Sequence, residues 1–217
     1  SMKYKTIAVI GLGQFGTTIA KMLASMSHEV LGVDINPEIV QKVSPYVTHA
    51  IVADTTDEEA IKALALSQFD IVIVAIGDNI QANLMTSMLL KEMKMPHVVS
   101  KAENALQGKM LKKMGVDMVI YPEYDVAQRL AQSLTREHVM DYLQLSKSIS
   151  LIEVDMPKFL VGTCLKDSNL REKYNLNAVG IRRGEDLEVP PNPFTILSAE
   201  EKLLIIGNNS DLDALTV

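Results

Sequence analysis

The sequence is poor in cysteine and has no long apolar run. Its single thiol, Cys164, cannot form an intrachain disulfide, so a reducing compartment suits the chain, and we expect this thiol to pack rather than to react. The longest apolar runs, such as residues 71–77, fall far short of the roughly 20 residues that a membrane helix requires. We therefore expect a cytoplasmic protein without a membrane span of its own.

Basic residues are outnumbered by acidic ones, with 21 Lys and Arg against 27 Asp and Glu and a formal net charge of -6. A negative chain without clusters of basic and aromatic residues is not expected to bind nucleic acid. The 217 residues, 47% of them hydrophobic, are enough for one or two globular domains with a sizeable core.

Signatures of catalysis are missing as well. The four histidines lack the spacing of metal ligands, and we expect structural roles for them. No nucleophile elbow, zinc-protease or P-loop pattern occurs either. We therefore expect that the protein is not an enzyme. The histidines are His28, His49, His97 and His138.

A glycine turn between an apolar run and a helical pattern organises the chain, in the stretch IAVIGLGQFGTTIA at 7–20. Gly11 allows a sharp turn, and Gly13 lets the backbone approach a pyrophosphate. Gly16 lets the helix pack close to the strand. A phosphate placed there meets the unpaired N–H groups of the helix N-terminus. The pattern predicts a nucleotide-binding strand, turn and helix.

A carboxylate in the right place strengthens this prediction. Asp34 ends the next apolar run, where an acceptor for the ribose hydroxyls belongs. Asp34 could alternatively cap the helix that begins near Pro37.

Apolar runs and amphipathic segments alternate up to residue 121, which predicts a doubly wound parallel α/β sheet of the Rossmann type over residues 1–121. Thr56 is expected to be a helix N-cap, with Glu59 completing a capping box. The expected strands are 7–10, 29–34, 48–54, 69–76, 96–101 and 115–121.

The pattern changes after residue 121. Residues 122–147 are expected to form a helix and linker, whose apolar positions pack either on the sheet or on a partner subunit. Residues 148–217 predict a small α+β domain with strands at 149–155, 177–183 and 202–206 and a helix at 165–174. The apolar helix positions are Val126, Ala127, Leu130, Ala131 and Leu134.

Ligands of an open parallel sheet bind at the carboxyl ends of its strands, which predicts one nucleotide-binding crevice. Asp54 and Thr55 could instead be only a turn, and Lys101 only a solvated loop lysine. Glu123 either suits a helix N-terminus or holds a cation beside phosphate oxygens. The predicted nucleotide-binding residues are Gly11, Gly13, Gln14, Phe15, Gly16, Asp34, Ile35, Asn36, Asp54, Thr55, Ile76, Gly77, Asn79 and Lys101.

The chain resembles the RCK (KTN) regulatory subunits of bacterial potassium uptake systems, of the KtrA and TrkA type, over nearly its whole length. The segments that carry the resemblance are IAVIGLGQFG, VDIN at 33–36, residues 53–57, VAIGDNIQAN at 74–83, SKAEN at 100–104, MGVDMVIYPE at 114–123 and LREKYNLNAVGIRR at 170–183.

The resemblance implies a homodimer that assembles into an octameric ring at the inner face of the membrane, under a potassium channel subunit. Binding of ATP or ADP would change the shape of the ring and gate transport, without catalysis. The helix from Glu123 would cross over to the dimer partner, and Glu123 itself matches a family glutamate associated with a divalent cation.

One residue departs from the family pattern. KtrA-type proteins commonly carry arginine at the position of Gln14, where it reaches the γ-phosphate of ATP in the neighbouring subunit. Glutamine can form a hydrogen bond there but carries no charge, so we expect weaker discrimination of ATP from ADP, for which Lys101 compensates in part.

The C-terminal domain resembles an RCK module that binds cyclic di-AMP between two copies in several relatives. Arginine suits a phosphate, asparagine an adenine edge and apolar side chains the base faces. Alternatively, the apolar residues are core and the arginine is a surface charge. The matching residues are Leu165, Arg171, Leu176, Asn177, Ala178 and Pro193.

A second class of function stays open. The glycine turn with Asp34 does not separate NAD from ATP or ADP, so a small NAD-dependent oxidoreductase or NAD(H) redox sensor is the alternative.

Overall fold

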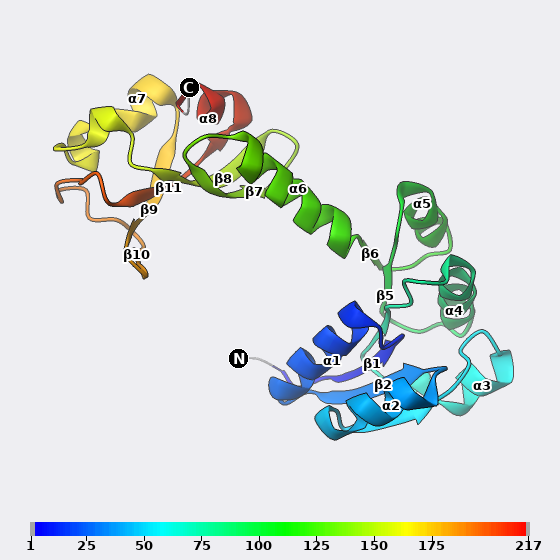
Figure 1. The fold of residues 1–217 in the computed structure, drawn as a ribbon. Helices are drawn as coiled ribbons and strands as arrows, with labels where there is room; N and C mark the ends of the chain where they lie inside the picture. Colours follow the sequence, from blue (N-terminus) through cyan, green and yellow to red (C-terminus); the bar gives the residue numbers. More distant parts are fainter. Residues whose placement is uncertain (1–2, 216–217) are drawn as a thin grey trace. The chain divides into compact units, whose positions relative to one another are not determined.

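The computed structural model describes residues 3–215, which divide into two compact units between Glu123 and Tyr124 (Figure 1). The first unit contains a parallel sheet with the strand order β3-β2-β1-β4-β5-β6, which confirms the predicted doubly wound sheet. Its strands are β1 Thr6–Ile10, β2 Glu29–Asp34, β3 His49–Val52, β4 Ile71–Val74, β5 Val98–Lys101 and β6 Met118–Ile120.

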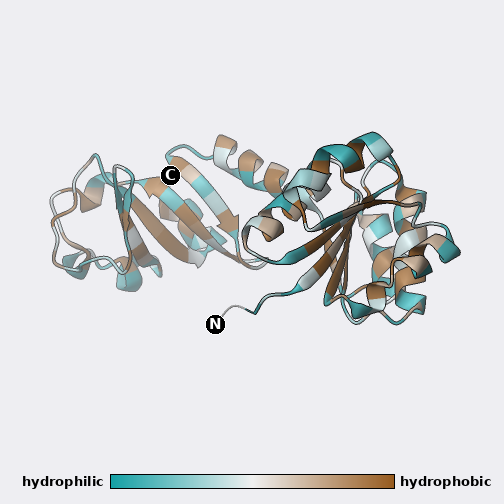
Figure 2. Cartoon of the chain, turned by 90° about the horizontal axis from the view of Figure 1, so that it is seen from below, coloured by the Kyte–Doolittle hydropathy of each residue, from teal (hydrophilic) through white to brown (hydrophobic). Residues whose placement is uncertain are grey.

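Helices cover both faces of this sheet. Along β1, Ile7 and Val9 pack in a core cluster with residues of α1 and α2. Ala8 and Ile10 pack in a second cluster with residues of α3, α4 and α5. Double coverage explains the continuous apolar strands, drawn in brown in Figure 2. The helices are α1 Gln14–Ser25, α2 Pro37–Val43, α3 Glu58–Ala63, α4 Ile80–Glu92 and α5 Ala105–Lys113, with 3-10 turns η1 Ser44–Tyr46 and η2 Leu66–Gln68.

The second unit contains an antiparallel sheet with the strand order β10-β9-β11-β8-β7. This confirms the small α+β domain. The strands are β7 Val139–Gln144, β8 Ile149–Asp155, β9 Asn177–Arg183, β10 Asp186–Glu188 and β11 Lys202–Asn208. The helices are α6 Pro122–Thr135, which begins at the boundary of the units, α7 Leu170–Tyr174 and α8 Asn209–Leu215, with 3-10 turns η3 Lys158–Leu160 and η4 Leu165–Asp167. Within residues 3–215, no helix is long and apolar enough to cross a membrane.

The start of α3 differs from the prediction. Asp57, and not Thr56, is the N-cap, because its side chain accepts a hydrogen bond from the amide of Glu59. The Thr56 hydroxyl instead donates to Asp54 Oδ1 at 2.6 Å. The predicted capping box is therefore wrong, and the helix begins at the next residue.

Two segments of the second unit also differ. Residues 165–174 form η4 and α7 rather than one helix, because Asn169 between them has a left-handed backbone with φ of 55°. The range 122–147, predicted as helix and linker, contains strand β7, which pairs with β8. The predicted domain start at 148 therefore falls in the turn between these two paired strands.

The face of α4 that meets the sheet carries buried polar side chains. Thr86 Oγ1 lies 2.8 Å from Thr55 Oγ1, and Ser87 Oγ lies 2.8 Å from Ser100 Oγ. Asn83, on the same face, is fully buried. The two hydroxyl pairs join α4 to the loop after β3 and to strand β5, and each hydroxyl satisfies its partner.

Replacing one member of the Ser87–Ser100 pair leaves the other hydroxyl buried without its partner. We expect Ser87→Ala and Ser100→Ala each to lower the free energy of unfolding by about 1–2 kcal/mol. The double variant is expected to lose less free energy of unfolding than the two single variants together, because it has no buried hydroxyl without a partner. Chemical denaturation of the three variants measures this coupling, and strictly additive losses would contradict a hydroxyl pair.

Candidate functional site

A cavity of about 740 Å³ lies at the carboxyl edge of the parallel sheet. It collects residues from the ends of β1 to β5 and from the loops that follow them, as expected for a doubly wound sheet. Every residue predicted to bind nucleotide lines this cavity except Gly16. These residues are Gly11, Gly13, Gln14, Phe15, Asp34, Ile35, Asn36, Asp54, Thr55, Ile76, Gly77, Asn79 and Lys101.

The three glycines of the turn have different surroundings. Gly11 has φ of +92°, and a Cβ atom there would lie 2.7 Å from the backbone nitrogen of Ile76. A Cβ atom on Gly16 would lie 1.8 Å from the carbonyl oxygen of Gly11. A Cβ atom on Gly13, by contrast, would meet nothing within 4 Å. Gly11 and Gly16 are therefore required for packing, whereas Gly13 leaves open space beside the cavity.

The N-terminus of α1 presents backbone donors at this point. Gly13 is the N-cap, so no side chain caps the helix, and the first turn of α1 contains no acidic residue. Unpaired N–H groups and the positive end of the helix dipole favour an anion. This is the chemistry expected for a pyrophosphate-binding turn.

Asp34 connects the end of β2 to the glycine turn. Its Oδ2 accepts a hydrogen bond from the amide of Leu12 at 2.8 Å, and its Oδ1 accepts from the amide of Asn36 at 2.8 Å. The N-cap of α2 is Asn36, whose side chain accepts from the amide of Glu38. The alternative that Asp34 caps this helix is therefore wrong, and the carboxylate lies at the cavity wall.

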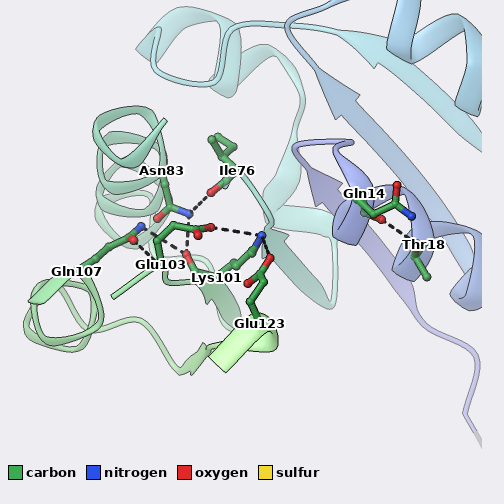
Figure 3. A network of polar contacts seen from close by, with 8 residues as sticks. All are labelled: Gln14, Thr18, Ile76, Asn83, Lys101, Glu103, Gln107 and Glu123. Atoms are coloured by element: carbon green, nitrogen blue, oxygen red, sulfur yellow. Dashed lines mark hydrogen bonds and ion pairs between the residues drawn. The ribbon is translucent and has the colours of Figure 1, made fainter. Parts of the chain in front are cut away.

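Lys101 is the ammonium group of the cavity wall. Only 9% of its side chain is exposed, so it is not a solvated loop lysine. Its Nζ lies 2.7 Å from Glu123 Oε1 and 3.3 Å from Glu103 Oε1 (Figure 3). The ring centroid of Phe15 lies 5.9 Å from the same nitrogen.

The ion pairs keep these groups charged. Burial opposes the charge of Lys101, but hydrogen bonds and attraction from Glu123 and Glu103 outweigh burial and raise its pKa. The hydrogen bond from Lys101 is the main cause that lowers the pKa of Glu123. The stabilising contribution of Lys101 is lost only as the pH rises through its raised pKa, and that of Glu123 only as the pH falls through its lowered pKa. Both groups are therefore charged at neutral pH.

The prediction missed Glu103, whose backbone is fixed by hydrogen bonds in the loop after β5. Its amide donates to Gln107 Oε1 at 2.7 Å, and Asn83 Nδ2 donates to the carbonyl oxygens of both Lys101 and Ile76 (Figure 3). A carboxylate two residues after the predicted lysine, in SKAEN, was the available signal. The further cavity residues absent from the prediction are Ile10, Ile39, Ala53, Thr56, Ala75, Asp78 and Ala82.

One copy of the chain does not supply a complete set of protein ligands for the cation predicted at Glu123. Glu123 and Glu103 both pair with Lys101. Among residues 3–215 there is no group of three or more His, Cys, Asp or Glu residues that could hold a metal ion. These residues alone do not fit a divalent cation, and the cation at Glu123 stays a prediction.

The residues predicted for a cyclic dinucleotide lie in the second unit. Arg171 and Asn177 are in contact, because the guanidinium donates to Asn177 Oδ1 at 3.0 and 3.2 Å. Leu176 is only 1% exposed and belongs to the core of this unit. Leu165 and Ala178 are partly buried against the same core, and the carbonyl of Pro193 accepts from the amide of Lys166.

Both units match models of known domain families. The TrkA-N domain matches residues 7–122, and the TrkA-C domain matches residues 149–216. The chain is 41% identical to Ktr system potassium uptake protein A of Bacillus subtilis over 97% of this chain and 95% of that protein. It is 40% identical to Ktr system potassium uptake protein C of the same organism over 96% and 94%. The Ktr system potassium uptake protein A of Vibrio alginolyticus is 32% identical over 96% and 94%.

Solved structures support the fold. The RCK domain of GsuK superposes with a TM-score of 0.71 and 16% identity, covering 99% of this chain and 47% of that one. The GsuK channel bound to NAD superposes with a TM-score of 0.70 and 16% identity over 98% and 39%. This chain therefore spans less than half the length of these two structures.

Gly13 and Gly16 make a matched pair for testing the cavity. We expect Gly13→Ala to weaken nucleotide binding at least about tenfold while costing no more than about 1 kcal/mol of stability, since only an N-cap preference is lost. Gly16→Ala is expected to lower stability by about 3 kcal/mol, because its methyl group overlaps a backbone oxygen. Thermal unfolding and nucleotide titration measure the two effects, and equal destabilisation by both substitutions would contradict this division of roles.

Proposed function

The chain belongs to the family of proteins with a TrkA-N and a TrkA-C domain, and from this we propose that it is a regulatory subunit that controls a membrane potassium transporter through adenine nucleotide binding. The relatives named above are components of Ktr potassium uptake systems. Their identity extends over nearly the full length of both chains, which supports the same role here.

The cavity at the carboxyl edge of the parallel sheet carries the nucleotide part of this proposal. It combines a helix N-terminus, open space at Gly13 and the carboxylate of Asp34 in one wall. The helix N-terminus and the open space at Gly13 suit a pyrophosphate, and the carboxylate of Asp34 suits the hydroxyls of a ribose. ATP and ADP are the proposed ligands.

Regulation requires that the ligand bind two states of the protein differently. The coupling between the nucleotide cavity and the transporter is then a difference in binding free energy rather than a reaction. Lys101 is one residue whose contacts can change when the nucleotide binds, because a phosphate near it competes with Glu103 and Glu123 for the same ammonium.

Helix α6 supplies a surface for assembly. It contains no buried residue, although its apolar side chains follow helical spacing. We propose that a second copy covers this face and that such dimers form a ring, as the resemblance implies. The large exposed residues of this helix are Tyr124, Val126, Leu130 and Leu134.

Thermal unfolding of the purified chain with ATP, ADP, NADH or NAD tests the nucleotide proposal. A ligand at 100 times its dissociation constant adds about 2.7 kcal/mol, which shifts the midpoint visibly. We expect ATP and ADP to stabilise the wild type, and the Gly13→Ala variant to show at most about half of this stabilisation at the same ligand concentration. Stabilisation by NADH alone would contradict the proposal and support the oxidoreductase or redox sensor.

The second unit is proposed to bind cyclic di-AMP between two copies. The contact between Arg171 and Asn177 favours this ligand, because it presents a guanidinium and an amide together on an exposed surface. A guanidinium binds phosphate in a bidentate way. The apolar residues of the proposed site are Leu165 and Ala178, which are partly buried against the core, and Leu176, which belongs to it.

Arg171→Ala tests this second site, with Lys173→Ala on the same helix as the control. We expect Arg171→Ala to weaken cyclic di-AMP binding at least about tenfold, since a charge-assisted contact is lost. Binding of ATP in the first unit should not change. Calorimetric titration of both ligands measures this, and an equal loss in the Lys173→Ala control would show that general charge, and not Arg171, attracts the dinucleotide.

A further inference from the structure

The cavity wall is strongly acidic for a site that is proposed to hold phosphates. Its charged side chains in the described part of the chain are five carboxylates and one ammonium, that of Lys101. Gln14, at the start of α1, adds no charge. The carboxylates are Asp34, Asp54, Asp78, Glu103 and Glu123.

These carboxylates do not act alike. Backbone amides of Leu12 and Asn36 donate to Asp34, and the amide of Thr56 donates to Asp54, so their charges are partly compensated. Glu103 and Glu123 instead share the ammonium of Lys101. An anionic ligand near Lys101 therefore has to displace or oppose two carboxylates.

Hydrogen bonds fix the backbone next to this contact, and Lys101 Nζ lies 3.3 Å from the carboxylate of Glu103. Its amide is bound by the buried Gln107, and the neighbouring carbonyl of Lys101 accepts from the buried Asn83. Gly77 lies opposite: a Cβ atom there would be 2.8 Å from Lys101 Nζ and 3.0 Å from Glu103 Oε1. The missing side chain at Gly77 thus leaves room for the ion pair.

We propose that Glu103 is a specificity-determining residue of this cavity, which disfavours nucleotides with additional phosphate charge by occupying Lys101. This inference rests on the proposed nucleotide binding and adds which of the two nucleotides, ATP or ADP, the cavity binds more tightly. Each further phosphate brings negative charge close to Glu103 and Glu123, where the repulsion is screened less than in bulk water. The cavity then binds ADP in preference to ATP when no divalent cation shields the phosphates.

Glu103→Gln tests the inference, since it keeps the size of the side chain and removes its charge. Dissociation constants for ATP and ADP are measured by calorimetry with EDTA present. We expect the ratio of ATP affinity to ADP affinity to rise about tenfold over that of the wild type. Glu103→Ala should move the ratio in the same direction. The control Asp78→Asn removes another cavity carboxylate that is not paired with Lys101 and should change the ratio much less.

A salt series separates charge from packing. Raising KCl from about 0.05 to about 0.5 M should shrink the difference between wild type and Glu103→Gln, because screening weakens the repulsion. An unchanged ATP to ADP ratio in Glu103→Gln and Glu103→Ala, or an equal loss of both affinities, would overturn the inference while leaving nucleotide binding intact. Absence of ATP and ADP binding in the wild type would instead overturn the proposed function.

Discussion

The close approach of the glycine turn to the end of β4 is the constraint on which the cavity depends. Gly11 lies against the backbone of Ile76, and Gly16 lies against the carbonyl of Gly11, so neither position has room for a side chain. Asp34 then holds the turn to the end of β2 through the amide of Leu12. Three neighbouring strand ends are thereby brought together, and the N-terminus of α1 is aimed at the space between them.

Long apolar segments with glycine turns made the first unit predictable. Such strands fit only a sheet covered on both faces, and the strand order follows from that class. Strand β7 was not predicted because a bulge breaks its alternation. The register shifts between Val139 and Asp141, so the buried residues Val139 and Tyr142 are three positions apart instead of two. The break at Asn169 was missed since a left-handed asparagine leaves no hydrophobic signal.

The residues around the cavity were predictable for a different reason. The rule that ligands meet the carboxyl ends of parallel strands needs only the strand positions, and these were clear. Glu103 was not predicted because it lies beyond the end of β5. Its ion pair with Lys101, which Glu123 shares, depends on how the loop after β5 folds back. Sequence patterns locate strand ends, but they do not show which side chains of different loops pair with one another.

Gly13 and Gly16 of the turn are also expected to be under different selection. A side chain at Gly16 would collide with the backbone whether or not a ligand is bound, while a side chain at Gly13 would meet open space. Selection for folding alone therefore preserves Gly16 and leaves position 13 free to drift. A descendant of this protein that lost its ligand would keep Gly16 and accumulate other residues at position 13. Positions 13 and 16 together therefore distinguish a domain that no longer binds its ligand from one that still does.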